Sequence, residues 1–464
     1  MASPLPTPAS VGFASAFAGP FVRRAVLSFF TPPGARAAAP ASGPDDASPL
    51  APAVAVPRSD GVSAPGPAGN GYDPALMAKK TTTSRPAASA RPASADPYAG
   101  RLARLRAAFA GSGADAMLIT GPKDVGYLTG FHGGDSYLLV PASGKPIVIS
   151  DFRYQEELEE VKHLARIKIR KGAILEATAE AVASVKAASL AVQGEHLTVA
   201  GLDGLKDQLK KTAGFRAKAI IPTVGIVLGL RTVKDAHEIR LIKQAVRVAE
   251  EALLATLPTI APGQTESEVA GRLEQEMKAR GASAPGFESI VAARANGSLP
   301  HYRPSSKVKL AANQPLLIDW GATVDAYHSD MTRTFALGRW PARVREIYEI
   351  VLDAHEKSAA ALRPGVSGRE IDLIARNHIK RHGYGKHFGH GLGHGVGLDG
   401  HEMPRLSHMA PDDPLEPGQV VTIEPGIYLP GVGGVRIEDD YLITENGAMN
   451  LCTLPRTLEW STLR

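Results

Sequence analysis

The sequence predicts an α+β protein in which a small α/β domain precedes a larger domain made of two related halves. Strand-like and helix-like segments alternate between residues 98 and 230, as they do where helices connect the strands of one sheet. After residue 231, two helix-start patterns recur roughly a hundred residues apart, and acidic residues at strand ends recur with a similar offset. A tandem duplication explains both recurrences.

The first segment, residues 1–97, differs in composition from the rest of the chain. It holds 17 of the 36 prolines, together with many Ala, Ser and Gly residues. Such a composition cannot bury enough apolar surface to offset the entropy lost on ordering, so we expect disorder. The stretch VGFASAFAGPFVRRAVLSFF is interrupted by a proline and an arginine pair, which argues against a membrane helix or an export signal. Met77 is an alternative start, in which case residues 1–76 come from an over-extended reading frame.

Residues 98–230 are expected to form the α/β domain. The segment RLARLRAAFAGSGADAMLIT reads as an amphipathic helix, a glycine turn and a strand over Ala116–Ile119. Strands are expected at YLLVP and PIVIS, helices at YQEELEEVKHLA and ILEATAEAVASVKAA, and a further strand at LTVAGLD. No residue of this domain suggests chemistry of its own.

The larger domain, residues 231–464, is expected to open with a helix capped by Asp235 and Glu238 that runs through Leu257. A second helix, over Ala342–Leu362, occupies the matching place in the other half. Apolar residues at helical spacing identify the core-facing side of the first helix: Ile239, Ile242, Ala245, Val246, Ala249 and Leu253.

The duplication is also visible in two further helix starts. The segments PGQTESE and PGVSGRE each open an amphipathic pattern, with Thr265 and Glu268 or Ser367 and Glu370 placed as a capping box. Helices packed on one face of a curved antiparallel sheet, with functional residues from the opposite face, would give an α+β architecture.

Four carboxylates follow the same repeat. Asp319 and Asp330 in the first half correspond to Glu424 and Glu438 in the second, and Asp319 and Glu424 directly follow apolar, strand-like runs. Although a single acid of this kind is more often a turn or capping residue, a buried one costs energy unless something pairs with it. Two related halves facing each other would bring both acid pairs to a common centre.

A metal centre is the expected reason for this clustering. Four carboxylates in one pocket repel one another unless cations of comparable charge lie between them, and two divalent ions supply that charge. His394, in GHGLGHGVGLDGHE, adds one imidazole. An oxygen-rich site with one imidazole suits manganese or cobalt and tolerates iron or zinc. Such a pair of ions can lower the pKa of a water held between them and direct the hydroxide at a carbonyl.

From about Arg231 to Trp460 the chain resembles the pita-bread metallopeptidases, a family that includes Xaa-Pro aminopeptidases, prolidases and methionine aminopeptidases. The five ligand positions match in type, order and approximate spacing. The resemblance implies that Asp319 binds one metal, that Asp330 and Glu438 bridge both, and that His394 and Glu424 bind the second. It also implies that Glu424 passes protons from the attacking water.

Four more residues match positions at the family's active site. His301 in LPHYRPS and His401 in LDGHEMP match substrate-side histidines, and an imidazole N–H would stabilise the oxyanion of the tetrahedral intermediate. His390 and Arg436 match positions that line or brace the site in the Xaa-Pro branch. The alternatives are solvated loop histidines and an ordinary surface arginine.

Residues 98–230, especially GPKDVGYLTGF, resemble the non-catalytic amino-terminal domain of Xaa-Pro peptidases and creatinase. The resemblance implies that this domain covers one side of the active site and takes part in forming a homodimer. The expected protein is thus a small α/β creatinase-like domain followed by a pita-bread catalytic domain.

The predicted function is that of a dimetal exopeptidase that hydrolyses the bond between an amino-terminal residue and proline, by means of a metal-bridging hydroxide. Its substrates would be peptides with proline at the second position. Aminopeptidase and dipeptidase action remain open, because loops at the substrate's carboxyl end decide between them. One alternative is methionine aminopeptidase, which usually lacks a domain such as residues 98–230. Another is a pita-bread binding protein without activity, against which the complete ligand set argues.

Composition narrows the cellular setting. The single cysteine, Cys452, allows no intramolecular disulfide and indicates no thiolate metal site, which favours a cytoplasmic enzyme. The net charge of +5 is small for 464 residues and is not gathered into a basic stripe, so we expect neither a nucleic acid nor a membrane as partner.

Overall fold

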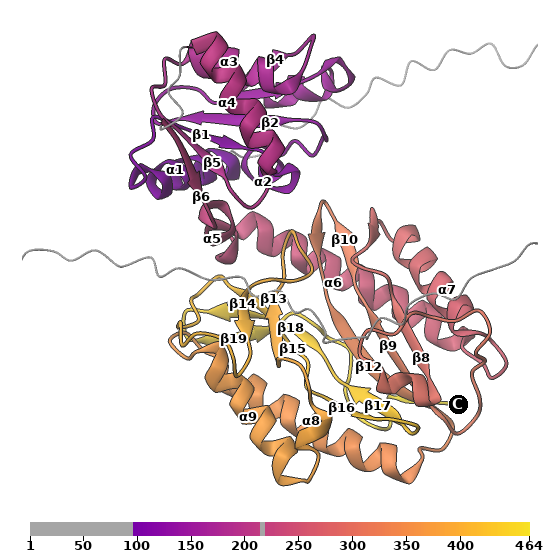
Figure 1. The fold of residues 1–464 in the computed structure, drawn as a ribbon. Coiled ribbons are helices and arrows are strands. Elements are labelled where there is room, and N and C mark those ends of the chain that lie inside the picture. Colours follow the sequence, from indigo (N-terminus) through magenta and orange to yellow (C-terminus); the bar gives the residue numbers. More distant parts are fainter. Residues whose placement is uncertain (1–95, 214–218) are drawn as a thin grey trace, which may run out of the picture. The chain divides into compact units, whose positions relative to one another are not determined.

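The computed structural model describes residues 96–213 and 219–464 (Figure 1). The expected extension over residues 1–97, including Met77, lies outside the described residues except for its last two positions. There the first helix, α1 (Pro97–Ala110), begins at a proline, and the Asp96 side chain accepts a hydrogen bond from the Tyr98 backbone N–H at 3.0 Å. The described residues all belong to one compact unit.

The first part of this unit is a six-stranded mixed sheet with helices, as the alternating pattern predicts. Strand order is β4-β3-β2-β1-β5-β6, with antiparallel pairing of β2 to both β1 and β3 and parallel pairing elsewhere. The strands are β1 (Ala116–Ile119), β2 (Tyr137–Pro141), β3 (Ile147–Ser150), β4 (Arg166–Ile169), β5 (Leu190–Gln193) and β6 (Ile220–Thr223). The helices after α1 are α2 (Pro122–Thr129), α3 (Ile174–Ser184), α4 (Val199–Ala213) and α5 (Ile226–Thr232). The expected boundary after residue 230 falls inside α5.

Two predictions for this region are wrong. The segment LTVAGLD opens helix α4, where the Thr198 side chain accepts a hydrogen bond from the Gly201 N–H at 3.0 Å. Leu205 and Leu209, four residues apart, are buried on one face of that helix, and the strand of this region is β5 instead. The segment YQEELEEVKHLA forms short 3₁₀ turns, including Glu157–Val161, in which only Leu158 and Val161 are buried. The exposed carboxylates of Glu156 and Glu160, four residues apart, would repel each other in an α-helix, which disfavours that structure here.

The helices of the second part confirm the predicted caps. Helix α6 (Ala236–Thr256) has a capping box from Asp235 and Glu238, and α7 (Glu266–Ala279) and α9 (Gly368–Arg381) have the boxes expected from the two PG segments. Helix α8 (Ala342–Ala361) matches the predicted second helix. Helices α6 and α7 pack together, as do α8 and α9, so each half contributes one helix pair (Figure 1).

The strands form two larger sheets that hold most of the ligand-bearing segments. One sheet has the order β20-β12-β9-β8 and the other β14-β13-β15-β18-β19; all pairs are antiparallel except β12 with β20. Their strands are β8 (Ile290–Ala293), β9 (Pro315–Trp320), β12 (Met331–Leu337), β13 (Gly393–Gly395), β14 (Glu402–Leu406), β15 (Val420–Ile423), β18 (Asp439–Thr444), β19 (Gly447–Asn450) and β20 (Thr462–Leu463). Smaller pairings involve β7 (Ala284–Pro285), β10 (Ala322–Val324), β11 (Tyr327–His328), β16 (Gly426–Leu429) and β17 (Gly433–Arg436). A bridge between Thr332 and Glu438 joins the two larger sheets.

The helix pairs of the two halves pack in different apolar clusters, and the first of these clusters also includes residues of the amino-terminal domain and of the second half, such as Val140 and Val420. Residues of α6, α7 and β9, including Leu253 and Trp320, pack in one cluster, and residues of α8, α9 and β15, including Val351 and Ile423, pack in the other. Full burial of one such aliphatic side chain stabilises the fold by about 1.5–3 kcal/mol. Five of the six predicted α6 core positions are buried, and Ile239 is partly buried. The predicted α+β fold class is therefore confirmed. The bridge between the two larger sheets lies where the two halves meet.

Among the described residues, no helix combines the length and the apolar character needed to cross a membrane.

Candidate metal centre

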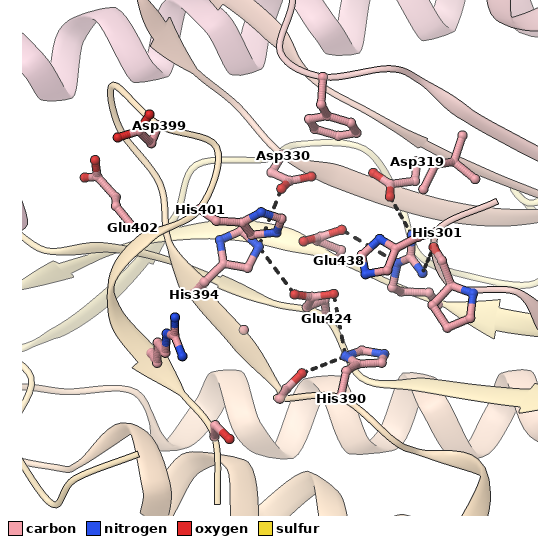
Figure 2. A pocket seen from close by; sticks show the side chains of 18 of the residues that line it. His301, Asp319, Asp330, His390, His394, Asp399, His401, Glu402, Glu424 and Glu438 are labelled. Carbon is pink, nitrogen blue, oxygen red and sulfur yellow. Dashed lines mark hydrogen bonds and ion pairs between the residues drawn. The ribbon is translucent and has the colours of Figure 1, made fainter. Parts of the chain in front are cut away.

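The five predicted ligands come from both halves of the larger domain and meet at one place (Figure 2). Asp319 lies on β9 and Asp330 immediately precedes β12. His394 is the middle residue of β13, Glu424 follows β15, and Glu438 lies between β17 and β18. The acids are thus brought together near the place where the bridge between Thr332 and Glu438 joins the two sheets.

The ligand atoms are close enough to share metal ions. Asp319, Asp330 and Glu438 offer oxygens that lie within 4.8 Å of one another, and His394, Glu424 and Glu438 form a second such group. The His394 Nε2 atom lies 3.4 Å from Glu424 Oε1 and 3.6 Å from Asp330 Oδ2. The two groups share Glu438, and a third group of donor atoms joins Asp330 and His394 to His401.

The electrostatics of the cluster fit a cation site. Burial, with repulsion from Glu438, raises the pKa values of Asp330 and Glu424 well above their ordinary range. Burial and the Asp319 charge raise the pKa of Glu438 to about 8. Divalent cations between these carboxylates would remove the repulsion. The Asp319 Oδ1 atom is buried and has no hydrogen-bond partner among the described residues, as expected of an atom that binds a metal.

His394 is also suited to bind a metal. Burial, together with the neighbouring His401, lowers its pKa to about 3, so the ring is neutral and keeps a lone pair for coordination. Its strand lies close to neighbouring backbone: a Cβ atom at Gly393 would lie 2.1 Å from the Thr422 carbonyl oxygen. A glycine is therefore needed next to the histidine, as the glycine-rich sequence suggested.

Arg436 braces the carboxylates from the side. Its Nη2 atom lies 2.5 Å from Asp319 Oδ2, and its Nε–H donates to the Thr332 hydroxyl at 2.9 Å. That hydroxyl donates to Glu438 Oε2 at 2.6 Å, and Arg436 Nη1 donates to the Tyr428 hydroxyl at 2.9 Å. With 3% of its surface exposed, Arg436 is not a surface arginine.

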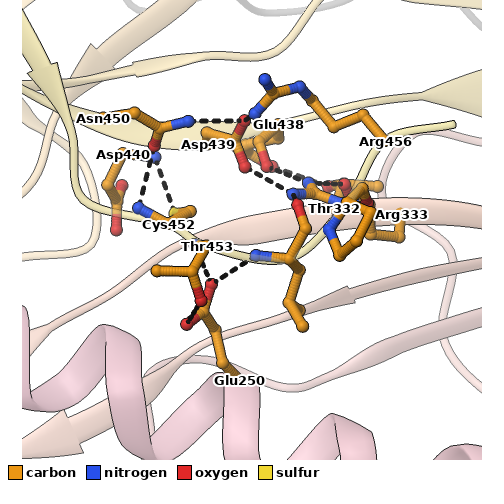
Figure 3. Close-up of polar contacts among 12 residues, drawn as sticks. Glu250, Thr332, Arg333, Glu438, Asp439, Asp440, Asn450, Cys452, Thr453 and Arg456 are labelled. Atoms are coloured by element: carbon orange, nitrogen blue, oxygen red, sulfur yellow. Dashed lines mark hydrogen bonds and ion pairs between the residues drawn. The ribbon is translucent and has the colours of Figure 1, made fainter.

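The backbone that carries Glu438 is held by a second buried arginine (Figure 3). Arg333 Nη1 donates to the Glu438 carbonyl at 2.7 Å, and Nη2 lies 2.6 Å from Asp439 Oδ1. The Asp440 carboxylate accepts a hydrogen bond from the Asp330 backbone N–H at 3.0 Å. The segments that carry Asp330 and Glu438 are therefore tied together directly.

The ligands line a cavity of about 780 Å³ that also contains the three other predicted histidines. His301 and His401 are exposed in it, and neither ring makes a hydrogen bond with the described residues. His390 is tied through Nε2 to the Tyr428 hydroxyl at 2.8 Å, and its Nδ1 lies 3.9 Å from Glu424 Oε2. Burial, with the Arg436 charge, lowers the pKa of His390 to about 4. Of the described histidines, His328, His355, His378, His382 and His387 lie outside the cavity lining.

Sequence reasoning missed several residues of this site. Thr332 and Tyr428 contact Arg436, and Arg405 lines the cavity. Their positions carry no motif signal, because each acquires its role from a partner distant in the sequence. Arg405 is the exception in principle, since it lies four residues after His401 in the same glycine- and histidine-rich segment.

Comparison with known proteins identifies the class. The profile of metallopeptidase family M24 matches residues 240–445, and that of the creatinase/prolidase N-terminal domain matches residues 101–233. The chain belongs to the M24 family, and it is a hydrolase of the peptidase class. The family implies divalent metal ions, and the carboxylate and histidine groups described above could hold them.

Its relatives place it in the Xaa-Pro peptidase branch. The chain is 37% identical over 347 residues to the Xaa-Pro dipeptidase of Pyrococcus horikoshii. The aligned residues make up 74% of this chain and 94% of that protein. The structure of an Xaa-Pro dipeptidase from Bacillus anthracis matches with a TM-score of 0.73 and 36% identity, covering 78% of this chain and 99% of that one. An X-Pro aminopeptidase structure from Thermotoga maritima matches with a TM-score of 0.68 and 35% identity, covering 74% and 97%.

Proposed function

We propose that this protein is a dimetal exopeptidase that hydrolyses the bond between an amino-terminal residue and proline. The observation that carries the proposal is the meeting of four carboxylates and one imidazole in the wall of a single cavity. The relatives described above are named as Xaa-Pro dipeptidases or as an X-Pro aminopeptidase, and this similarity supports Xaa-Pro peptides as the substrate class.

The ligands fall into two groups in this proposal. Asp319 would help to hold one ion, His394 and Glu424 would help to hold the other, and Asp330 and Glu438, which lie near both groups, would contribute to both sites. Two bound ions would supply an activated water and polarise the scissile carbonyl. Manganese is the proposed metal, because an oxygen-rich ligand set with one imidazole suits it.

Glu424 is the proposed proton carrier. It lies at the cavity wall, beside the other proposed ligands. A carboxylate at this place could take a proton from the attacking water and deliver it to the nitrogen of the departing proline. His390 is held by the Tyr428 hydroxyl and the Gly391 carbonyl, and its ring would limit the space open to the Glu424 carboxylate, 3.9 Å away.

His301 and His401 are the proposed oxyanion donors. Burial, with the nearby His301, lowers the pKa of His401, so its ring is neutral at pH 7 and carries one N–H. Both rings are exposed to the cavity. A neutral imidazole N–H placed there would stabilise the negative charge that develops on the former carbonyl oxygen.

Proline suits this arrangement because its amide nitrogen has no hydrogen. An ordinary peptidase loses a hydrogen bond at that position, whereas a dedicated site gains binding energy from the ring. The side chains of Phe287, Ile290 and Tyr302 line the cavity and offer apolar surface for a pyrrolidine.

The position of Arg405 supports dipeptides, rather than longer peptides, as the proposed substrates. It is an exposed residue of the cavity lining, and its guanidinium makes no ion pair with the described carboxylates. Of the other two arginines of the lining, Arg303 lies 3.4 Å from Glu288 and Arg436 pairs with Asp319. An arginine without an internal partner can bind the free carboxylate of an Xaa-Pro dipeptide through two parallel hydrogen bonds.

Two broader features complete the proposal. The single cysteine supports a cytoplasmic location, and the creatinase-like amino-terminal domain supports a homodimer.

A substrate panel with added manganese tests the function. Xaa-Pro dipeptides, Xaa-Pro-Yaa tripeptides and Met-Ala-Yaa peptides should be compared by kcat/KM. Replacing proline by alanine should lower kcat/KM by at least about tenfold, and acetylating the amino terminus should abolish cleavage. Faster cleavage of Met-Ala-Yaa than of Ala-Pro or Ala-Pro-Yaa would instead identify a methionine aminopeptidase. No cleavage of any peptide by the metal-loaded protein would favour a binding protein.

A further inference from the structure

The loop between β13 and β14, residues 396–401, carries His401 into the cavity. The His401 ring packs edge-on against the His394 ring, with the ring centroids 3.9 Å apart, and makes no hydrogen bond with the described residues. Its position therefore depends on this contact and on the backbone of the loop. Two carboxylates flank the histidine closely, Asp399 and Glu402. Figure 2 shows both directed away from the metal ligands, whereas His401 points toward them.

Arg231 binds both of these carboxylates. Its Nη2 atom lies 2.5 Å from Asp399 Oδ2 and 2.9 Å from Glu402 Oε2. Lys234 adds a second cation, with its Nζ 2.6 Å from Glu402 Oε1. Arg231 belongs to α5 and Lys234 precedes α6, so a segment distant in the sequence holds the loop on both sides of its histidine.

The other end of the Arg231 guanidinium is anchored as well. Its Nη1 atom lies 3.0 Å from Asp124 Oδ1, and the second oxygen of that carboxylate accepts from the Gln193 amide at 2.6 Å. Arg231 is 3% exposed and Asp124 is fully buried. Buried charges are tolerated only in well-paired geometry, so this network admits few alternative positions for the loop.

We propose that Arg231 is a positioning residue that sets the location of the His401 imidazole by holding Asp399 and Glu402. The proposal rests on the role of His401 as an oxyanion donor. Without Arg231, each carboxylate keeps only its own lysine, Lys123 at Asp399 and Lys234 at Glu402. The two carboxylates then lose the one cation that joins them and ties them to Asp124, so the loop shifts. A displacement of about 1 Å at a reacting group costs up to about a hundredfold in rate.

Arg231→Met tests this, with Arg101→Met as the matched control. Arg101 is 1% exposed and pairs with Asp235 at 2.8 Å and with Glu238 at 3.6 Å, and it does not contact residues 396–402. Both variants remove one buried guanidinium and should lower the unfolding temperature. We expect kcat to fall by about 10- to 100-fold in Arg231→Met alone, with KM within about threefold and metal content unchanged.

Two further variants separate positioning from general damage. Arg231→Lys keeps a cation beside the carboxylates and should recover part of the lost kcat, which also covers the case in which Arg231→Met fails to fold. In the His401→Ala background, replacing Arg231 should cost less than about threefold, because the group that it positions is already absent.

The outcomes are distinct. Equal kcat losses in Arg231→Met and Arg101→Met, or losses that multiply in the Arg231→Met/His401→Ala double variant, would overturn the proposal for Arg231. A low kcat in His401→Ala together with full activity in Arg231→Met would also overturn the proposal for Arg231, but it would leave the proposed function intact. A fully active His401→Ala would show that the assigned role of His401 is wrong, and with it this proposal.

Discussion

Thr332 provides the sharpest test of the metal centre, because a single hydroxyl connects a ligand to its brace. The hydroxyl donates to Glu438 and accepts from Arg436 Nε, and Thr332 is fully buried. Thr332→Val keeps the shape of the side chain and removes both hydrogen bonds. Arg436 Nε, already 4.0 Å from Glu438 Oε2, would then pair with that carboxylate and compete with the metal.

The size of the effect follows from these contacts. A hydrogen bond to a charged group contributes about 1.5–3 kcal/mol. Loss of that amount from the metal-bound state corresponds to roughly 10- to 100-fold weaker binding, the range found when an outer partner of a metal ligand is removed. We expect this loss in a calorimetric titration of the metal-free protein with manganese.

Thr334→Val is the matched control. Thr334 lies on the same strand, is fully buried, and its hydroxyl bonds only the Arg436 backbone, donating to the carbonyl at 3.1 Å and accepting from the N–H at 3.2 Å. Both variants should lose similar stability toward urea, whereas Thr334→Val should bind manganese within about threefold of wild type. Equal manganese affinity in the two variants and wild type would refute the bracing role of Thr332.

The remaining predictions concern the ligands, the histidines and pH. Elemental analysis of the reconstituted protein should find about two divalent ions per chain, because four carboxylates carry too much negative charge for one ion. Asp330→Ala or Glu438→Ala should lower metal binding at both sites. Activity that persists in chelator, without stoichiometric metal, would contradict this prediction. His394→Ala should lower metal occupancy and kcat together. His301→Ala and His401→Ala should each lower kcat by about 10²–10³ with both metals retained. If the His301→Ala and His401→Ala variants were both fully active, the assignment of these histidines as oxyanion donors would be wrong. Because the folded state raises the pKa of Glu438 from 4.5 to about 8, the native metal-free protein binds more protons than the unfolded chain. The stability from this group is present below about pH 4.5 and lost as pH rises through 8, and manganese affinity should rise over the same interval. Chemical unfolding with and without manganese at several pH values would measure both slopes, and flat profiles would count against a coupled cluster.

Local rules were sufficient for much of the larger domain. The capping boxes at Thr265 and Ser367 were predictable because a cap and its partner lie three residues apart, and both form. The apolar runs before Asp319 and Glu424 indicated buried strands, which the structure contains as β9 and β15. The same reasoning was wrong for LTVAGLD, where the cap at Thr198 outweighs the β-branched residues that favour a strand.

The sequence by itself determined the class of chemistry, because acids in apolar strand ends, repeated in two halves, require something that neutralises them. Only the tertiary structure decided how those acids are held. Thr332 reaches Glu438 across 106 positions of the chain, and Arg231 reaches Asp399 across 168. Such contacts have no local signature: each depends on which strand pairs with which and on where a loop returns. The proposed metal ligands could therefore be predicted from their own type and position, whereas the residues that orient them became visible only when the two halves were placed together.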